Sequence, residues 1–463
     1  MKIKINSRVL IALSLVTCGS LNCRKLTLVP EPVNTITTVE AFSTDATATS
    51  AIVGIYSDFL NHRFSNGSEF PSSYWGMSAD ELRTFGGPSR FETNTLDAVS
   101  GNSNGFWISG YYDIYLANAA LEALPISDNV SPALKKQLSG EAEFFRAFFH
   151  FYLLNIYGDV PLVMSTSYRV NTILPRSSSS IVYRQIKADL IDAQEKLADD
   201  YSLSNGERIR VNRFGATALL ARVYLYNQQW DSAEAQASSV IANNSLYQLN
   251  NDLNETFLAN NSEAILQLQT PDIYPYATKE GNTFNPSNNT SRPNYYLTNQ
   301  VLAAFESSDL RRKDWVDSTN FSGTTYYYPH KYKIFVGTQG NNSEYYMILR
   351  LAEQYLIRAE ARAQQNNLIG AISDLNVIRE RAGLSDLPPL LTQPELLAAV
   401  AQERRVEFFA EWGHRWLDLK RTGQADSVLG AIKPTWKPTA KLYPIPAPEL
   451  INNANLTQNP GYN

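Results

Sequence analysis

Two segments of the chain repeat the same helical pattern, and this internal repeat constrains the fold more than any other feature. The first is TALLARVYLYNQQWDSAEAQASSVI, residues 217–241, and the second is QYLIRAEARAQQNNLIGAISDLNVI, residues 354–378. Each has small and apolar residues at helical spacing on both sides of a short polar turn, which predicts a pair of antiparallel helices. The residues that carry the pattern are Leu220, Ala221, Tyr224, Ala233 and Val240 in the first copy, and Tyr355, Ala359, Ala371, Leu375 and Ile378 in the second.

The helix pairs resemble tetratricopeptide repeats, but a long insertion rich in Asn, Thr, Tyr and Pro separates them. Within it, EAILQLQT (263–270) has the character of a strand. Further helical patterns cover residues 38–60, 106–125, 133–163, 179–198 and 395–423. We therefore predict a mostly α-helical, tetratricopeptide-like scaffold with a loop-rich irregular insertion. The scaffold lies mainly in 38–60, 106–242 and 345–425, and the loop-rich, ligand-binding parts lie mainly in 61–105 and 243–344.

Both cysteines of the chain, Cys18 and Cys23, lie near its N-terminus. Basic residues at positions 2, 4 and 8 precede the apolar run VLIALSLV, which is typical of a secretory signal peptide and too short to span a bilayer. A cysteine that closes such a segment indicates a lipoprotein, cleaved before the cysteine and acylated on its thiol. We predict a lipoprotein signal peptide over residues 1–22 and a lipid anchor, such as palmitate, on Cys23. Cys18, with Leu15 three residues ahead of it, is the alternative.

Composition and motifs argue against several classes of function. The 40 basic and 45 acidic side chains give a net charge of −5, which disfavours a nucleic-acid surface. The four histidines form no HxxxH or HExxH pattern, and no phosphate-binding loop or GxSxG motif occurs. We therefore expect no cofactor, no histidine or cysteine metal site, no nucleic-acid partner and no catalytic activity. A calcium site built from loop oxygens stays an open alternative.

Glu403, Glu407 and Glu411 are spaced i, i+4 along one predicted helix, beside several arginines. A pair of carboxylates could indicate a glycoside hydrolase. Carboxylates one helical turn apart and next to arginines are more often members of an ion-pair network. We predict such a network here and for Glu141 and Arg146, and we expect His150 to be a packed helical residue.

Four segments, in order along the chain, resemble signature segments of the SusD/RagB family of outer-membrane nutrient-binding lipoproteins. They are GEAEFFRAFFHFYLLNIYGDVPLV, LRLAEQYLIRAEARAQ, ERRVEFFAEWGHRWLDLKRTG and the C-terminal LYPIPAPEL…NPGY, while CRKLTLVPEP resembles the start of the mature protein. The resemblance implies a single SusD-like domain over 23–463, in which a tetratricopeptide-like half supports a loop-rich half with the ligand site. It also implies a surface lipoprotein of the outer membrane that binds glycan fragments and caps a TonB-dependent (SusC-like) barrel transporter.

Two features depart from the family pattern. The residues after Cys23 are basic and apolar, whereas acidic residues there often accompany export to the cell surface. A bulky side chain, Trp412, precedes Gly413 in the segment FFAEWGHRW.

Loop aromatics next to polar side chains are the candidate ligand-binding residues. A flat ring covers the C–H face of a sugar, while amide and charged groups bond its hydroxyls. A first cluster contains Tyr74, Trp75, Asp80 and Phe85, with Arg83 and Arg90. A second contains Tyr274 and Tyr276 with Asp272 and Asn282, and a third contains Tyr295 and Tyr296 with Asn294 and Arg292. Trp315 is a fourth candidate, and Tyr326, Tyr327 and Tyr328 alternate as in a strand with at least one expected in the core.

The sequence thus predicts a surface glycan-binding lipoprotein that delivers oligosaccharides to a barrel transporter. Three alternatives stay open. The first is a peptide- or glycopeptide-binding lipoprotein of the same uptake type. The second is an anchored glycosidase, and the third is a structural scaffold whose helical repeats dock partners.

Overall fold

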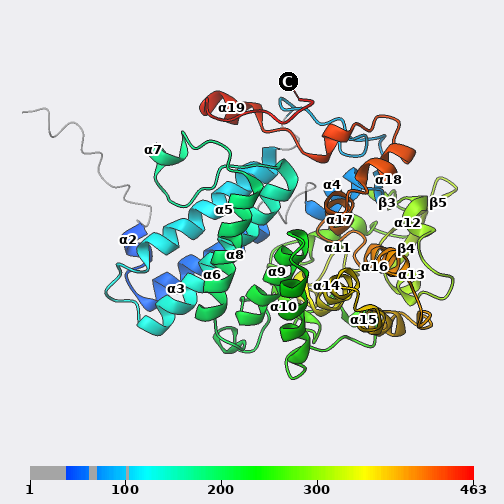
Figure 1. Cartoon of the computed structure of the whole chain (residues 1–463), viewed down its shortest axis with the longest axis horizontal. Helices are drawn as coiled ribbons and strands as arrows, with labels where there is room; N and C mark the ends of the chain where they lie inside the picture. The colour runs from blue at the N-terminus through cyan, green and yellow to red at the C-terminus, as the bar shows by residue number, and fades with distance from the viewer. Residues whose placement is uncertain (1–37, 62–69, 101–103, 463) are drawn as a thin grey trace, which may run out of the picture.

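The computed structural model describes residues 38–61, 70–100 and 104–462 (Figure 1). The predicted signal peptide and both candidate anchor residues, Cys18 and Cys23, lie outside this part of the chain. Within it, no helix is both long enough and apolar enough to cross a membrane.

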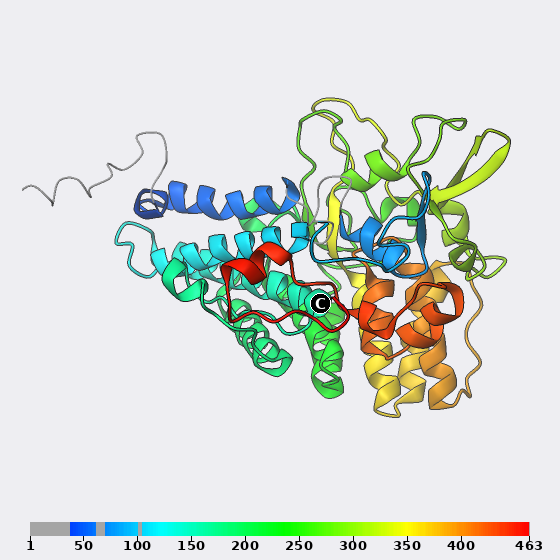
Figure 2. The ribbon, with the colours of Figure 1, turned by 90° about the horizontal axis from the view of Figure 1, so that it is seen from above.

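Helices form most of the described residues in 38–60 and in 106–242, as predicted. The helices of the first half of the chain are α2 (Thr38–Ala41), α3 (Asp45–Asn61), α4 (Pro71–Ser78), α5 (Asn104–Ala123), α6 (Pro132–Tyr157), α7 (Tyr168–Asn171), α8 (Ser179–Lys196), α9 (Arg213–Tyr226) and α10 (Trp230–Ala242), with a short 3₁₀ turn at Ser202–Ser204. Helices α5, α6, α8, α9 and α10 pack each against the next, so they form one continuous array (Figure 2).

The two predicted repeats are stacked directly on one another. The first is α9 with α10, and the second is α14 (Leu351–Gln364) with α15 (Leu368–Arg381). Helix α10 packs against α14, and the guanidinium of Arg362 on α14 lies 2.8 Å from the carboxylate of Glu234 on α10. The insertion between the repeats therefore leaves the helical array instead of interrupting it.

Helix α6 lies at the centre of the core, because every residue from Phe145 to Tyr157 except Asn155 is buried. Pro132 occupies its first turn, and Gly158, with φ +74°, ends it. The helix is shorter than the predicted 133–163, since it stops at Tyr157. Its aromatic side chains form the main core with residues from distant elements, including Phe59, Trp75 and Trp412.

The remaining helices lie in the second half of the chain. They are α11 (Lys279–Phe284), α12 (Asn299–Leu302), α13 (Leu310–Asp314), α16 (Gln393–Glu407), α17 (His414–Arg421), α18 (Ala425–Ile432) and α19 (Ala447–Asn452), with 3₁₀ turns at Leu253–Glu255 and Pro438–Lys441.

The strands form three small antiparallel pairs. The first is β1 (Leu82–Thr84) with β3 (Tyr295–Leu297), the second is β2 (Ala264–Leu268) with β6 (Tyr346–Arg350), and the third is the hairpin of β4 (Val316–Phe321) with β5 (Thr324–Pro329). The predicted strand in 263–270 is therefore confirmed as β2. The predicted strand at Tyr326–Tyr328 is confirmed as part of β5, and Tyr328 is buried as expected.

Two expected helical stretches are broken. The stretch 38–60 divides into α2 and α3, and the stretch 395–423 divides into α16 and α17. Between α16 and α17 the chain takes positive φ angles at Ala410, Trp412 and Gly413, which an α-helix cannot contain. The loop-rich part 61–105 also contains a helix, α4, which the sequence did not predict.

Candidate ligand-binding site

The short strands β1 and β3 bring together two segments that are far apart in the sequence. Arg83 pairs with Tyr296, and Leu82 pairs with Leu297. Because side chains alternate between the two faces of a strand, Arg83 and Tyr296 share one face. The leucine pair is buried on the other face. The core therefore fixes the register that places Arg83 beside Tyr296.

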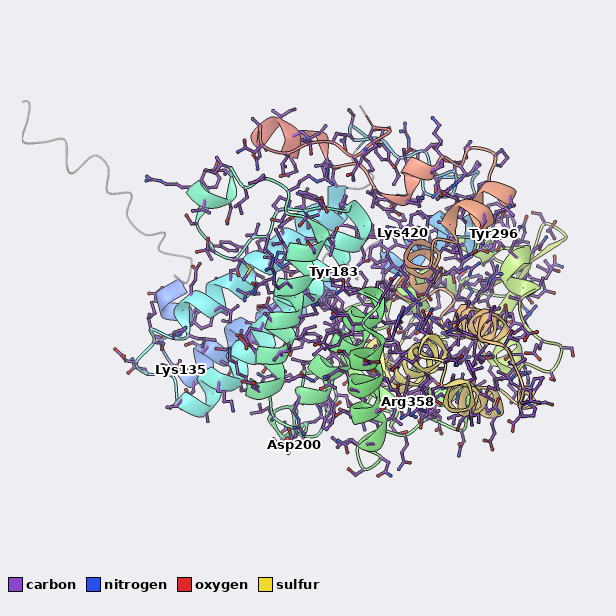
Figure 3. All side chains as sticks on the ribbon, viewed as in Figure 1. Lys135, Tyr183, Asp200, Tyr296, Arg358 and Lys420 are labelled. Atoms are coloured by element: carbon purple, nitrogen blue, oxygen red, sulfur yellow. The ribbon has the colours of Figure 1, made fainter. Side chains whose placement is uncertain are left out.

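Four half-buried aromatic side chains meet at this place: Phe85, Tyr296, Phe321 and Tyr326. The ring of Phe85 lies 5.4 Å from that of Phe321 and 5.3 Å from that of Tyr326, and the rings of Tyr296 and Tyr326 are 5.2 Å apart, all edge to face. We call this group the aromatic platform. In Figure 3, Tyr296 lies on the side of β3 and β5, far from Lys135 at the start of α6.

Hairpin geometry explains why β4 and β5 contribute rings to the platform. Thr319 pairs with Tyr326, and Phe321 pairs with Thr324, so all four residues share one face of the hairpin. The hairpin turns at Ser322 and Gly323, which both have positive φ, as a type I′ turn requires. The hydroxyl of Thr319 donates a hydrogen bond to the carbonyl of Ser291, which holds the hairpin beside β3.

Cationic groups border the platform. The guanidinium of Arg292 lies over the ring of Phe85, 5.4 Å from its centre. The side chain of Arg83 is 52% exposed, and its Nε is 3.6 Å from the carboxylate of Glu92, too far for a tight ion pair. The guanidinium of Arg83 is therefore available to donate hydrogen bonds to a ligand on the platform.

A polar pocket of about 140 Å³ adjoins Arg83 and is also lined by Asp80, Glu92, Gln300 and Lys433. The ammonium of Lys433 donates to the carbonyls of residues 77 and 78 and to the side-chain oxygen of residue 94, and burial lowers its pKa to about 7. Burial also raises the pKa of Glu92. Because Lys433 already donates to three protein oxygens, the pocket offers a ligand the donors of Arg83 and Gln300 and the carboxyl of Glu92.

Asp80 has a structural role as well. Burial would raise the pKa of its carboxyl, but hydrogen bonding and charge from Arg415, with the charge of Arg405, hold that pKa below its usual value. The Asp80 oxygens lie 2.8 Å from Arg415 Nε and 2.6 Å from Arg405 Nη2. Asp80 is therefore ionised and already paired, which leaves Arg83 as the stronger candidate for ligand contact.

A pair of tyrosines, one exposed and one half-buried, lies in the loop of residues 271–277, here called the tyrosine loop. Tyr274 is 71% exposed, and its ring is 6.1 Å from that of Tyr276 at nearly a right angle. The loop is held by two backbone contacts, since Gly337 N donates to Pro275 O and Gly340 N donates to the carboxylate of Asp272. The structure therefore brings Tyr274 and Tyr276 together, as the sequence predicted, on an ordered support.

Three predicted site residues are buried in the core, and these expectations are corrected. Trp75 and Trp315 have no exposed surface, and Tyr295 is 7% exposed. The ring of Trp75 stacks on Tyr152, and the indole N–H of Trp315 donates to the carbonyl of Leu253. None of these rings has a free face for a sugar. Another predicted site residue, Tyr74, is half buried, and its ring stacks on that of Phe91 at 3.9 Å between ring centres.

The sequence did not predict that Phe321 belongs to the aromatic platform. It also did not predict that Tyr326 contacts Phe85 of the first cluster and Tyr296 of the third. The signal that could have found it is the Ser-Gly pair between two β-prone runs, which predicts a tight hairpin. Phe85, Tyr296 and Arg292 belong to the predicted clusters, but no sequence pattern indicates that they meet.

The predicted ion-pair network is confirmed. Glu407 is fully buried and accepts from Arg350 and Arg311, and it pairs with Arg381 as well. Glu141 pairs with Arg210 and Arg146 with Asp189, so these two are members of separate networks. His150 is buried, as expected, and burial lowers its pKa to about 4. Among residues 38–61, 70–100 and 104–462, no group of three or more His, Cys, Asp or Glu side chains is arranged to hold a metal ion.

The fold and this surface define a class of protein in which a stacked helical array supports irregular loops that present aromatic and cationic side chains. Comparison with known proteins identifies the family. The chain matches the SusD family over residues 189–462, and residues 39–225 match the family described as starch-binding and associating with the outer membrane. The chain therefore belongs to the SusD family, as its signature segments predicted.

Individual relatives agree with this assignment. SusD-like protein P2 of Formosa agariphila is 28% identical over 98% of both chains. Starch-binding protein SusD of Bacteroides thetaiotaomicron is 37% identical over 123 residues, which is 25% of this chain and 21% of the relative. Among solved structures, a laminarin-binding SusD-like protein has a TM-score of 0.78 at 24% identity, covering 91% of this chain and all of the neighbour. A SusD superfamily protein from Bacteroides vulgatus has a TM-score of 0.79 at 22% identity with the same coverage. The predicted fold class is therefore confirmed.

Proposed function

We propose that this protein binds oligosaccharides at the aromatic platform and delivers them to a TonB-dependent barrel transporter of the outer membrane. The observation that carries the proposal is the meeting of Phe85, Tyr296, Phe321 and Tyr326 next to the exposed guanidinium of Arg83. Sugar rings have apolar C–H faces and polar rims, and this surface offers partners for both.

The platform suits reversible capture. Each stacked ring contributes on the order of 1 kcal/mol beyond the area it buries, so several rings and polar contacts must act together. The rings pack on one another and on paired strands, which keeps the ordering cost of binding low. We therefore expect modest affinity, binding without turnover, and a severalfold loss when one ring is removed.

The names of two relatives support a glycan ligand. One structural neighbour is described as laminarin-binding, and one sequence relative is described as starch-binding. These ligands belong to the relatives, and both are glucose polymers. They make glucan oligosaccharides the first ligands to test.

A binding panel tests the class of ligand. The intact mature protein is titrated with laminari- and malto-oligosaccharides, with uncharged peptides of matched length, and with glycopeptides. Binding to at least one oligosaccharide series, without release of smaller sugars on long incubation, is the expected result. Binding to peptides alone would favour the peptide-uptake alternative, and accumulation of shorter sugars would favour an anchored glycosidase.

The proposal includes an anchor and a transporter partner. Cys23→Ser is expected to release the protein from the membrane fraction, whereas Cys18→Ser is expected to leave it anchored. An acyl group found on Cys18 by mass spectrometry would reverse that assignment.

A barrel transporter is needed because a lipid-anchored binding protein has no pore of its own. Gentle detergent extraction followed by affinity purification should recover a large β-barrel protein with this chain, and recovery of this chain alone would contradict the partnership.

A further inference from the structure

A groove of about 800 Å³ lies between the helical repeats and the C-terminal helices, on a surface distinct from the aromatic platform. Its walls come from the end of α9 and the start of α10, from α14, and from α16, α17 and α18 (Figure 1). Its volume is within the range of established ligand pockets, about 300 to 1,000 Å³. Aliphatic and indole side chains line one part of it, among them Trp230, Leu397 and Val428.

Two deeply buried side chains at this groove have polar atoms without a hydrogen-bond partner. They are the hydroxyl of Tyr226 and Nη1 of Arg404, whose residues are 8% and 2% exposed. Nε of Arg405, at the same groove, also lacks a partner. A buried donor that is left unpaired costs free energy, so a ligand that pairs with it gains stabilisation on binding. All three atoms can donate a hydrogen bond, so the ligand group that suits them is an acceptor.

The charges of the groove indicate that this acceptor is anionic. Four arginines line it, at positions 404, 405, 415 and 421, against two carboxylates, Glu360 and Asp418. Arg421 pairs with both carboxylates, and Arg404 pairs with Asp418. Asp80, outside the groove, accepts from Arg405 and Arg415. Four positive charges therefore face three negative ones, and one positive charge remains.

We propose that this groove binds an extended peptide segment of a partner protein, anchored by one Glu or Asp side chain. The carboxylate accepts hydrogen bonds from Arg404 Nη1 and the Tyr226 hydroxyl, and apolar residues of the segment contact the wall near Trp230 and Leu397. A peptide fits better than a sugar because the apolar side chains of the wall are mostly aliphatic rather than a set of flat rings. Glutamine side chains at positions 228, 364 and 424 also lie along the groove, where they can bond a peptide backbone.

The test begins with a library of random decapeptides selected on the intact protein, followed by calorimetry with a selected peptide. Enrichment of peptides with an acidic residue among apolar ones is expected, and replacing that residue by Gln or Asn should abolish binding. Tyr226→Phe removes only the hydroxyl and should weaken binding about tenfold. Because that hydroxyl has no partner in the free protein, Tyr226→Phe should leave thermal stability unchanged or raise it.

Two variants at one position distinguish the effect of an added charge on peptide binding from the effect of added side-chain volume. Ala398 is exposed on α16 and lines the groove. Ala398→Glu should weaken the selected peptide strongly, whereas Ala398→Lys, of similar size, should retain binding. Tyr296→Ala, on the platform, should not affect it, so failure of this proposal and failure of the glycan proposal give different results.

Several outcomes would overturn the proposal. The first is a selection that enriches no acidic peptide. The second is a selected peptide that binds Tyr226→Phe and Ala398→Glu as tightly as the parent. The third is binding of an acidic oligosaccharide, such as an oligogalacturonate, that is lost in Tyr226→Phe, which would assign the groove to a sugar acid instead.

Discussion

At the scale of single residues, Glu81 and Asp80 show how burial and partners separate two neighbouring carboxyls. Burial, with a smaller contribution from the charge of Asp80, raises the pKa of Glu81 to about 8, and its closest donor is the backbone N–H of Ala410 at 3.3 Å. Asp80 is held ionised by its two arginines. Only one of the two adjacent side chains therefore carries a charge at neutral pH.

We expect Glu81→Gln to become more stable, relative to the parent, as pH rises. The folded-state pKa of Glu81 lies above its unfolded value, so its stabilising contribution is complete below pH ~4.3 and is lost as pH rises through about 8. Gln does not titrate, so the variant does not lose this contribution. Between pH 5 and pH 9 the free energy of unfolding of the variant should therefore rise, relative to that of the parent, by on the order of 3 kcal/mol. Urea unfolding at pH 5 and pH 9 measures it, with the exposed Glu195→Gln as control. A difference that does not depend on pH would contradict the assignment.

Residue type alone could not predict which loop aromatics are exposed. Trp75 lies in PSSYWGMS, a segment with the composition of a loop, yet this segment forms α4 and packs into the core. Its burial depends on Gly413 and Tyr152, which are remote in the sequence. In contrast, Tyr274 could be predicted as exposed because it lies between polar and proline-rich residues in a loop.

At the scale of elements, the turn between α16 and α17 determines how the C-terminal helices meet the core. Gly413 has φ +63°, and a Cβ placed on it would lie 2.5 Å from the Cβ of Trp75. Trp412, the bulky residue that precedes Gly413 and departs from the family pattern, packs well in the core. It is buried, contacts the rings of Phe59 and Tyr346, and donates its indole N–H to the carbonyl of Met347.

Gly413→Ala is therefore expected to destabilise the fold by about 3 kcal/mol, from the left-handed backbone and the clash with Trp75 combined. Gly423→Ala is the matched control, because Gly423 has φ +72° and a Cβ added there would have nothing within 4 Å. The control should cost about 1 kcal/mol, and the excess in Gly413→Ala measures the clash. Equal losses in chemical denaturation would show that Trp75 moves away freely.

Element prediction succeeded where the pattern is long and periodic. The helix pairs α9–α10 and α14–α15 each repeat small and apolar residues over several turns. The pair of β1 with β3 could not be predicted, because each strand has only three residues and its partner lies in a distant part of the chain. The platform depends on that pairing, so the sequence identified several of its residues without showing that they meet.

At the scale of the whole molecule, a buried charge cluster joins the repeats to the loop-rich half. Glu407 on α16 pairs with Arg350 at the end of β6, with Arg381 on α15 and with Arg311 on α13. Burial alone would raise the pKa of Glu407, but the charges of Arg381, Arg350 and Arg311 hold it well below its usual value. Four elements from separate parts of the chain thus share one carboxylate.

Replacing this carboxylate should be strongly destabilising. Glu407→Gln leaves three buried arginines with less charge compensation, and we expect a loss of about 3 to 5 kcal/mol. The contribution of Glu407 is present above pH ~4.3 and is lost as pH falls further, so the parent and variant should converge in acid. Glu306→Gln is the control, since Glu306 is 51% exposed in its pair with Arg379 and should cost at most about 1 kcal/mol. Equal effects of the two variants would contradict a central role for the cluster.

Calorimetric titration of the platform variants with the best oligosaccharide from the panel tests the central claim most directly. Phe85→Ala, Tyr296→Ala and Tyr326→Ala should each weaken binding severalfold or more, with circular dichroism unchanged. Tyr168→Ala, which removes a 79% exposed ring on α7 at the opposite end of the molecule, should bind as the parent does (Figure 1). If folded platform variants bind the sugar as tightly as the parent while Tyr274→Ala or Tyr276→Ala loses it, the ligand binds at the tyrosine loop and the platform assignment is wrong.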